Sequence, residues 1–243
     1  QVGLNVCVAN LIRKIKQLGI VAEVPAVPAT LLGAVELTPV EVAQMYQSLA
    51  AGGYSVPLRS VTAVLTPRGD LLSRYPLRFM PLENREAIAL LNFALTRVVE
   101  EGTAQALHGL LGSNTVIAGK TGTTNERRDS WFVGYTRDRV AASWVGLDNN
   151  RPAGVTGSNA AMRVWARLFR ALPIEALDLR MPDGANFVWV DKQQQALTDP
   201  SCPGAEQIPF IEGSEPQKST NCLKKQDSKN RKSLWRKWFG RKD

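Results

Sequence analysis

The stretch AGKTGTTNERRDSWFVGY, residues 118–135, decides the fold. A β-branched run, TVI at 115–117, leads into it, and an apolar run at 130–135 closes it after a polar turn. Two strand-like runs joined by Asn, Glu, Arg and Asp residues predict a β-hairpin. A third apolar run follows at 140–147. We therefore expect KTGT, residues 120–123, to lie on or beside an extended segment.

The residue types of this KTGT box suit an acidic, peptide-like ligand. Gly122 lacks a side chain, so another backbone can come close to the strand. Lys120 supplies a cation, and the hydroxyls of Thr121 and Thr123 supply two donors for an anion lying along the strand. The box therefore predicts a binding edge for a peptide-like acid.

A phosphate-binding loop is the main competing interpretation, because Gly119-Lys120-Thr121 matches the end of the Walker pattern. That pattern needs a glycine five residues before Gly119, where this chain has Asn114. It also needs a flexible loop that runs into a helix, whereas strand-like residues flank this match. The spacing and the context both disfavour a nucleotide site, which leaves a surface hairpin with a chance lysine as the second alternative.

The sequence around the box resembles the penicillin-binding transpeptidases. The similar segments, in the order of the family, are LGAVELTPVEVA at 32–43, GTA at 102–104, KTGTTN at 120–125, DSWFVGY at 129–135 and WVGLDN at 144–149. The likeness is greatest to the bifunctional class A enzymes of Gram-negative bacteria, of the 1b type, and runs from Gly3 to about Leu172. It implies an α/β fold of the β-lactamase and penicillin-binding transpeptidase type, an antiparallel sheet flanked by helices, incomplete at the N-terminus.

The same resemblance implies a serine-type D,D-transpeptidase that cross-links peptidoglycan stem peptides, in a parent protein that is also a glycosyltransferase. Its serine would attack D-Ala-D-Ala, and β-lactams would imitate that substrate. Lys120 would supply a positive electrostatic field near the serine of the second box and the substrate carboxylate. Thr121 and Thr123 would form hydrogen bonds with that carboxylate. The Thr123 backbone N–H would join the oxyanion hole, and Gly122 would keep the strand clear for the peptide.

The family's other two catalytic boxes are incomplete in this sequence. No serine of the chain begins a Ser-x-x-Lys pattern. Asn5 matches the asparagine of the Ser-x-Asn box, but Gly3 stands at the serine position, and Asn5 is as well explained as a turn or cap residue. The sequence therefore fits either a fragment of a larger enzyme or a degenerate, non-catalytic wall-peptide or protein-interaction module.

The chain shows neither a signal peptide nor the run of ~20 apolar residues that a spanning helix needs. Because the family is membrane-anchored, the resemblance implies a place on the periplasmic side of the bacterial inner membrane, with the anchor outside this chain. His108 is the single histidine. One histidine cannot supply a two-histidine metal site, and we expect neither a metal nor a cofactor.

Three segments are expected along the chain: a transpeptidase portion at 1–173, a small appendage at 174–204, and a disordered linker with a basic, Trp-containing tail at 205–243. Periodicity and capping residues predict helices at 9–18, from Thr38 onward, at 83–99, and from Ser158 onward. Strands are expected at 55–65 and 187–190. Cys202 and Cys222 would pair in an oxidising compartment, or they are unrelated thiols, and Cys7 would be buried.

The positive charge is concentrated in the tail. Residues 223–243 hold nine Lys and Arg against two Asp, which accounts for +7 of the chain's net charge of +8. The folded part is therefore close to neutral, and nucleic-acid binding gains no support. Leu234, Trp235, Trp238 and Phe239 would share one face of a short helix, a pattern that suits an anionic membrane surface, although a solvated tail explains it equally well.

Deleting residues 223–243 should reduce salt-sensitive binding to anionic vesicles, because the positive charge lies almost wholly in that tail. Co-sedimentation with vesicles at low and high salt measures the effect. Unchanged binding of the truncated chain would leave the tail as a solvated linker.

Overall fold

The computed structural model describes residues 2–112, 115–220 and 222. The described residues form two compact units, with the boundary in the sequence between Arg180 and Met181. The expected division after residue 173 falls too early, because Leu177 is buried in the core of the first unit and donates its backbone N–H to Val116. The predicted basic tail, residues 223–243, lies outside the described residues.

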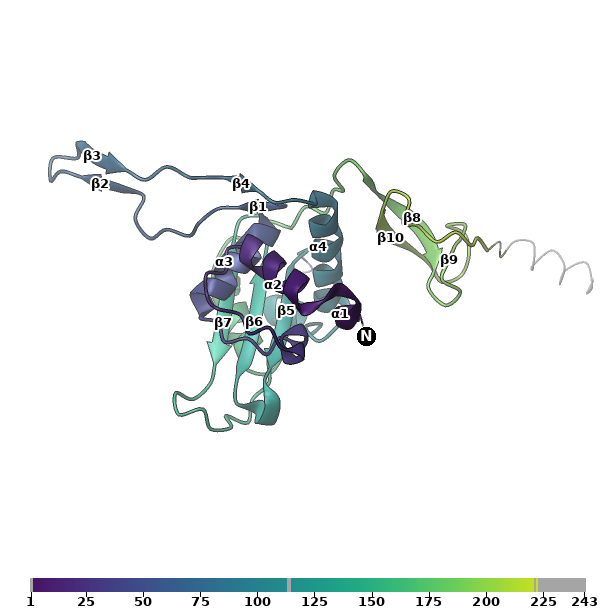
Figure 1. The fold of residues 1–243 in the computed structure, drawn as a ribbon, viewed down its shortest axis with the longest axis horizontal. Helices are drawn as coiled ribbons and strands as arrows, with labels where there is room; N and C mark the ends of the chain where they lie inside the picture. The colour runs from purple at the N-terminus through teal and green to yellow at the C-terminus, as the bar shows by residue number, and fades with distance from the viewer. Residues whose placement is uncertain (1, 113–114, 221, 223–243) are drawn as a thin grey trace, which may run out of the picture. The chain divides into compact units, whose positions relative to one another are not determined.

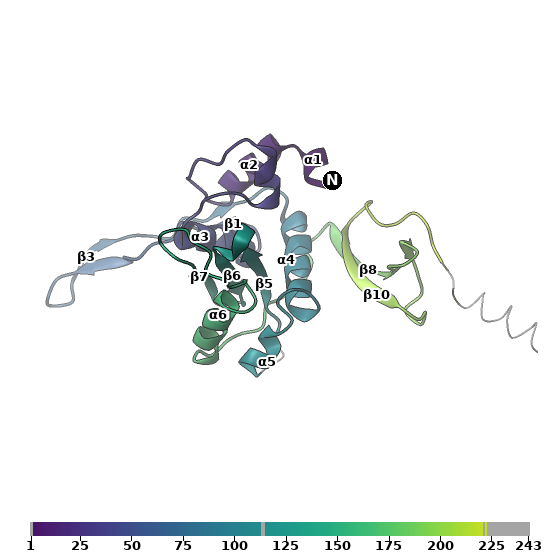
Figure 2. The same cartoon turned by 90° about the horizontal axis from the view of Figure 1, so that it is seen from below.

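The centre of the first unit is an antiparallel sheet of β5 (Ala118–Thr123), β6 (Ser130–Tyr135) and β7 (Val140–Val145), in the order β5-β6-β7 (Figure 1). Lys120 pairs with Val133, and Gly122 pairs with Trp131. The predicted hairpin is therefore present, with the KTGT box inside β5. The helices on both sides of this sheet confirm the expected α/β architecture (Figure 2).

Helices α3 (Pro39–Ala50) and α4 (Arg85–Glu100) contact the sheet and contribute to one core cluster. The predicted capping box of α3 is present: Thr38 accepts from the Glu41 N–H, and the Glu41 carboxylate accepts from the Thr38 N–H. Asn84 caps α4 through its side chain. In the core, the Tyr135 hydroxyl donates to Asn92 at 2.7 Å, and burial raises the pKa of Tyr135 well above its usual value.

Helix α6 (Ala161–Arg170) packs against β6 and β7 and contacts the short α5 (Leu107–Leu111). Trp165 is fully buried, stacks on Phe169 with ring centroids 3.6 Å apart, and donates its indole N–H to the carbonyls of Gly134 and Ala141. The prediction that Ser158 caps this helix is wrong, because α6 begins three residues later, after Ala160. Thr156 and Asn159 instead close a turn before it through mutual backbone–side-chain hydrogen bonds.

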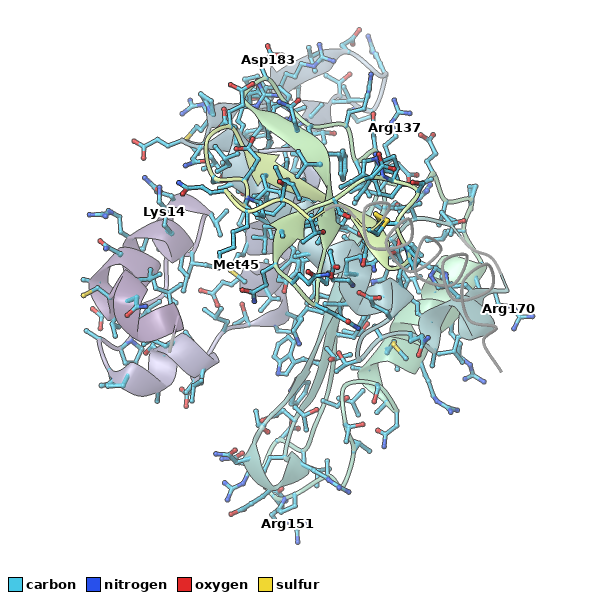
Figure 3. All side chains as sticks on the ribbon, turned by 90° about the vertical axis from the view of Figure 1, so that its right-hand side faces the viewer. Lys14, Met45, Arg137, Arg151, Arg170 and Asp183 are labelled. Atoms are coloured by element: carbon cyan, nitrogen blue, oxygen red, sulfur yellow. A yellow bond between two sulfur atoms is a disulfide. The ribbon has the colours of Figure 1, made fainter. Side chains whose placement is uncertain are left out.

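The N-terminal segment comprises α1 (Val2–Val6), α2 (Val8–Gln17) and the 3₁₀ helix η1 (Pro28–Leu32). It lies on the side of the sheet opposite α6, as the labelled Lys14 of α2 and Arg170 of α6 show in Figure 3. The predicted helix at 9–18 is present with its N-terminus one residue earlier. Cys7 is exposed, contrary to expectation, because it sits between two short helices with a positive φ of 70°.

A long hairpin arm, residues 54–81, leaves this unit between α3 and α4 (Figure 1). Its base pairs β1 (Tyr54–Ser55) with β4 (Met80–Pro81), and its tip pairs β2 (Ala63–Leu65) with β3 (Leu71–Arg74). The single strand expected at 55–65 is thus two short strands. Pro57 has no N–H to continue the first ladder, which gives the chain a local reason to break there.

The second unit holds an antiparallel sheet of β8 (Ala185–Asp191), β9 (Ala196–Leu197) and β10 (Ala205–Ile211), in the order β10-β8-β9. The strand predicted at 187–190 lies within β8. The expectation of disorder from residue 205 is wrong for β10, which pairs with β8 along its whole length. A disulfide joins Cys202 to Cys222 (Figure 3). Within the described part of the chain, the helices are too short or too polar to cross a membrane.

Trp165→Ala should destabilise the protein by about 3–5 kcal/mol, because it removes a fully buried indole and leaves a cavity beneath β6. Leu168→Ala, on the same helix at 51% exposure, is the matched control and should change the free energy of unfolding by less than about 0.5 kcal/mol. Urea unfolding followed by circular dichroism measures both. Equal losses in the two variants would contradict the described packing of α6.

Candidate functional site

The KTGT box lies on an edge strand. β5 pairs with β6 along one side, and no other strand of the described residues pairs with its second side. The strand starts buried at Ala118 and Gly119 and ends exposed at Thr123. An unpaired strand edge offers its backbone N–H and C=O groups to an extended peptide. The box therefore stands where a peptide could add to the sheet.

Side chains alternate along β5, so Lys120 and Gly122 face one side of the sheet and Thr121 and Thr123 face the other. Lys120 is exposed, and its ammonium donates to the Thr121 carbonyl at 2.8 Å. This hydrogen bond bends the lysine side chain back along the box. A positive charge, two hydroxyls and the free strand edge thus lie within a few residues of one another.

Thr103 is a neighbour of the box to which the sequence interpretation gave no role. Its hydroxyl lies 2.6 Å from that of Thr121. Thr103 follows α4 in a tight turn, in which Ala104 is fully buried and donates its N–H to Val98. A Cβ on Gly102 would stand 2.8 Å from the Val98 Cα, so this turn requires glycine there. The only sequence signal was the Gly-Thr-Ala match, which carries no information about this contact.

Gly157 is the second neighbour that the sequence interpretation missed. Its N–H donates to the Thr123 hydroxyl at 3.1 Å. A Cβ on Gly157 would stand 2.6 Å from the Trp131 carbonyl oxygen and 2.7 Å from that of Gly122. The backbone that comes close to Gly122 thus includes the chain's own loop before α6. That loop fixes Thr123 from the α6 side of the sheet.

The turn after the box is closed by Asp129. The Thr124 hydroxyl donates to the Asp129 carboxylate at 3.0 Å and accepts from the Asp129 N–H at 2.8 Å. The second carboxylate oxygen accepts from the Trp144 indole N–H at 2.9 Å. The short helix η2 (Asn125–Arg127) spans this turn. These contacts fix the exposed end of β5, where Thr123 lies.

Asn5 does not join this group in the structure. It is exposed on α1, whose contacts are with α2 and η1. Its role as the second-box asparagine stays a prediction. His108 lies half-buried in α5, on a helix as expected. Among residues 2–112, 115–220 and 222, no cluster of three His, Cys, Asp or Glu side chains could hold a metal ion.

Comparisons with known proteins identify the family of this chain. The family model of the penicillin-binding protein transpeptidase domain matches residues 26–172. Penicillin-binding protein 1B of Vibrio cholerae is 36% identical over 213 residues, covering 88% of this chain and 26% of that protein. Penicillin-binding protein 1B of Escherichia coli is 35% identical over 191 residues, covering 79% of this chain and 22% of that protein.

Solved structures share the fold. The crystal structure of penicillin-binding protein 1A from Haemophilus influenzae matches with a TM-score of 0.78 at 21% identity, covering 88% of this chain and 38% of that one. The structure of PonA1 from Mycobacterium tuberculosis in complex with penicillin V matches with a TM-score of 0.56 at 24% identity, covering 69% of this chain and 50% of that one. The chain spans about a quarter of the length of the curated relatives above. It belongs to the penicillin-binding protein transpeptidase family and covers a portion of that domain.

Proposed function

We propose that this chain forms the β5 side of a serine-type D,D-transpeptidase site that cross-links peptidoglycan stem peptides. The observation that carries the proposal is the arrangement of Lys120, Thr121 and Thr123 on a free strand edge, with each hydroxyl held by a neighbour on the protein side. The ligand class is a peptide that ends in a carboxylate, here the D-Ala-D-Ala end of a stem peptide, which β-lactams imitate. The family membership supports this choice.

Each residue of the box would have a role that depends on its position along β5. The ligand peptide would extend along the unpaired edge of β5, and its carboxylate would accept from the Thr121 and Thr123 hydroxyls. The Lys120 ammonium would leave the Thr121 carbonyl, which it now contacts, and raise the positive field at the reacting serine and the carboxylate. The Thr123 N–H would donate to the oxyanion that develops when the serine attacks.

The nucleophile has to come from elsewhere. The reaction forms a serine ester with the penultimate D-Ala, releases the terminal D-Ala with a proton on its amine, and then passes the acyl group to an amine of a second stem peptide. No Ser-x-x-Lys occurs in residues 1–243. We therefore assign the serine and its activating lysine to sequence outside this chain, and Asn5 to the second box of the same site.

The setting follows from the same proposal. The site would work on the periplasmic side of the inner membrane, in a protein that also carries a peptidoglycan glycosyltransferase, as class A enzymes do. The basic tail would add contact with an anionic membrane surface. The alternative is a non-catalytic module that retains the edge strand and binds wall peptides without acyl transfer. It draws its support from the missing nucleophile.

The 243-residue chain alone should remain unlabelled by a fluorescent penicillin at high concentration. A covalent acyl-enzyme needs a nucleophile with an activating base, and free serine hydroxyls are weak nucleophiles without one. In-gel fluorescence and intact-mass measurement follow the adduct. Stoichiometric labelling that maps to one serine within residues 1–243 would overturn the assignment of the nucleophile to other sequence.

In the full-length protein, defined as the longest reading frame that contains residues 1–243, Lys120→Ala should slow acylation by penicillin about 10²-fold or more. Losing a well-placed electrostatic group costs roughly 3 kcal/mol of transition-state stabilisation. The second-order rate of acylation, followed by stopped-flow fluorescence, measures the effect. Lys218→Ala, an exposed lysine of the second unit, is the control and should react as the wild type does.

A Lys120→Ala protein that acylates at the wild-type rate would remove Lys120 from the site. A wild-type full-length protein that forms no acyl-enzyme but still binds stem peptides reversibly would favour the non-catalytic alternative.

A further inference from the structure

We infer that Thr103 is a positioning residue, which donates a hydrogen bond to the Thr121 hydroxyl and so aims the Thr121 proton at the ligand carboxylate. This inference rests on the proposed function and deepens it, since it concerns how the carboxylate subsite is set. It starts from the 2.6 Å contact between the two hydroxyl oxygens.

The direction of that hydrogen bond follows from counting protons. A threonine hydroxyl has one proton to donate and two lone pairs to accept with. In the structure, either of the two hydroxyls could be the donor. When a carboxylate binds, Thr121 can give its single proton to only one acceptor, and the charged one holds it more strongly. Thr103 must then donate, which gives a relay from Thr103 through Thr121 to the carboxylate.

The second threonine of the box shows the same pattern with a different partner. The Thr123 hydroxyl accepts from the Gly157 backbone N–H at 3.1 Å, so its own proton stays available for the ligand. Gly157 can only donate in this contact, because the atom that it contributes is its backbone N–H. Both box hydroxyls thus accept a hydrogen bond from the protein side and keep a proton for the outer side. Chained hydrogen bonds polarise one another, which makes each outer proton a better donor.

The surroundings of Thr103 indicate that its side chain serves to orient the Thr121 hydroxyl and does not serve to fill the core. Its side chain is exposed, so the core gains little from it. The residues beside it fix its place instead: Gly102 fits against Val98 where no Cβ could, and the buried Ala104 donates its N–H to the Val98 carbonyl. The end of α4 thus holds one exposed hydroxyl at a set position beside β5.

Two variants separate the hydroxyl from the shape of the side chain. Thr103→Val keeps the branched shape and removes the hydroxyl, whereas Thr103→Ser keeps the hydroxyl and removes a methyl group. Because the side chain is exposed, neither change should move the melting temperature by more than about 2 °C. Acylation of the full-length protein is then measured with benzylpenicillin, which carries a carboxylate, and with its methyl ester, which does not.

We expect Thr103→Val to slow acylation by benzylpenicillin about tenfold, near the upper end of what one neutral hydrogen bond contributes, and to slow the ester reaction much less. The ratio of the benzylpenicillin rate to the ester rate should fall in Thr103→Val and return to the wild-type value in Thr103→Ser. A role in general structure would lower both rates together. An unchanged ratio, or equal losses for acid and ester, would overturn the inference while the proposed function stands.

A second measurement does not depend on acylation. Three-bond couplings about χ1 of Thr121, measured by NMR in the 243-residue chain, should show one rotamer in the wild type and in Thr103→Ser, and averaging in Thr103→Val. A single wild-type rotamer in the valine variant would overturn the inference. If the full-length wild type reacts with neither compound, the proposed function fails, and these couplings alone decide whether Thr103 orients Thr121.

Discussion

The close approach of the Gly157 backbone to β5 is the constraint on which the site depends. No side chain fits at Gly157, since a Cβ would stand 2.6 Å from the Trp131 carbonyl oxygen. The loop can therefore lie directly on the hairpin, where Ser130 accepts from the Ala161 N–H and donates to the Thr156 carbonyl. These contacts place the start of α6, and with it the Trp165 side chain that covers the sheet. The same loop fixes the Thr123 hydroxyl, so core packing and the geometry of the KTGT box have a common cause.

Local patterns in the sequence predicted the elements that local chemistry determines. The hairpin around KTGT and the Thr38–Glu41 capping box are both present, because each depends on residues close together in the chain. The start of α6 was wrongly predicted at Ser158. Thr156 and Asn159 form hydrogen bonds with each other across this position, and they close a turn that precedes the helix. Strand β10 was missed because its partner β8 is distant in sequence and its own residues include a proline.

The sequence predicted the residues of the KTGT box as a candidate site. It did not predict the residues that form hydrogen bonds with them. The short motif and its flanks predicted Lys120, Thr121 and Thr123 as site residues, and the structure places all three on β5. The contacts from Thr103 and Gly157 join residues 18 and 34 positions apart, and no periodicity connects them. A glycine in a polar loop predicts a turn, whereas Gly157 is needed for a tertiary contact. The resemblance supplied the order of the motifs, and only the three-dimensional structure shows which hydroxyls meet.

The central claim is that β5 holds a ligand carboxylate between Thr121 and Thr123, with Thr103 and Gly157 behind them. A crystal structure of the full-length protein acylated by benzylpenicillin tests it most directly. The account predicts carboxylate oxygens within about 3 Å of both box hydroxyls, and a short contact between Thr103 and Thr121 that persists in the adduct. A carboxylate bound elsewhere, with Thr121 turned away from it towards the protein, would contradict the account.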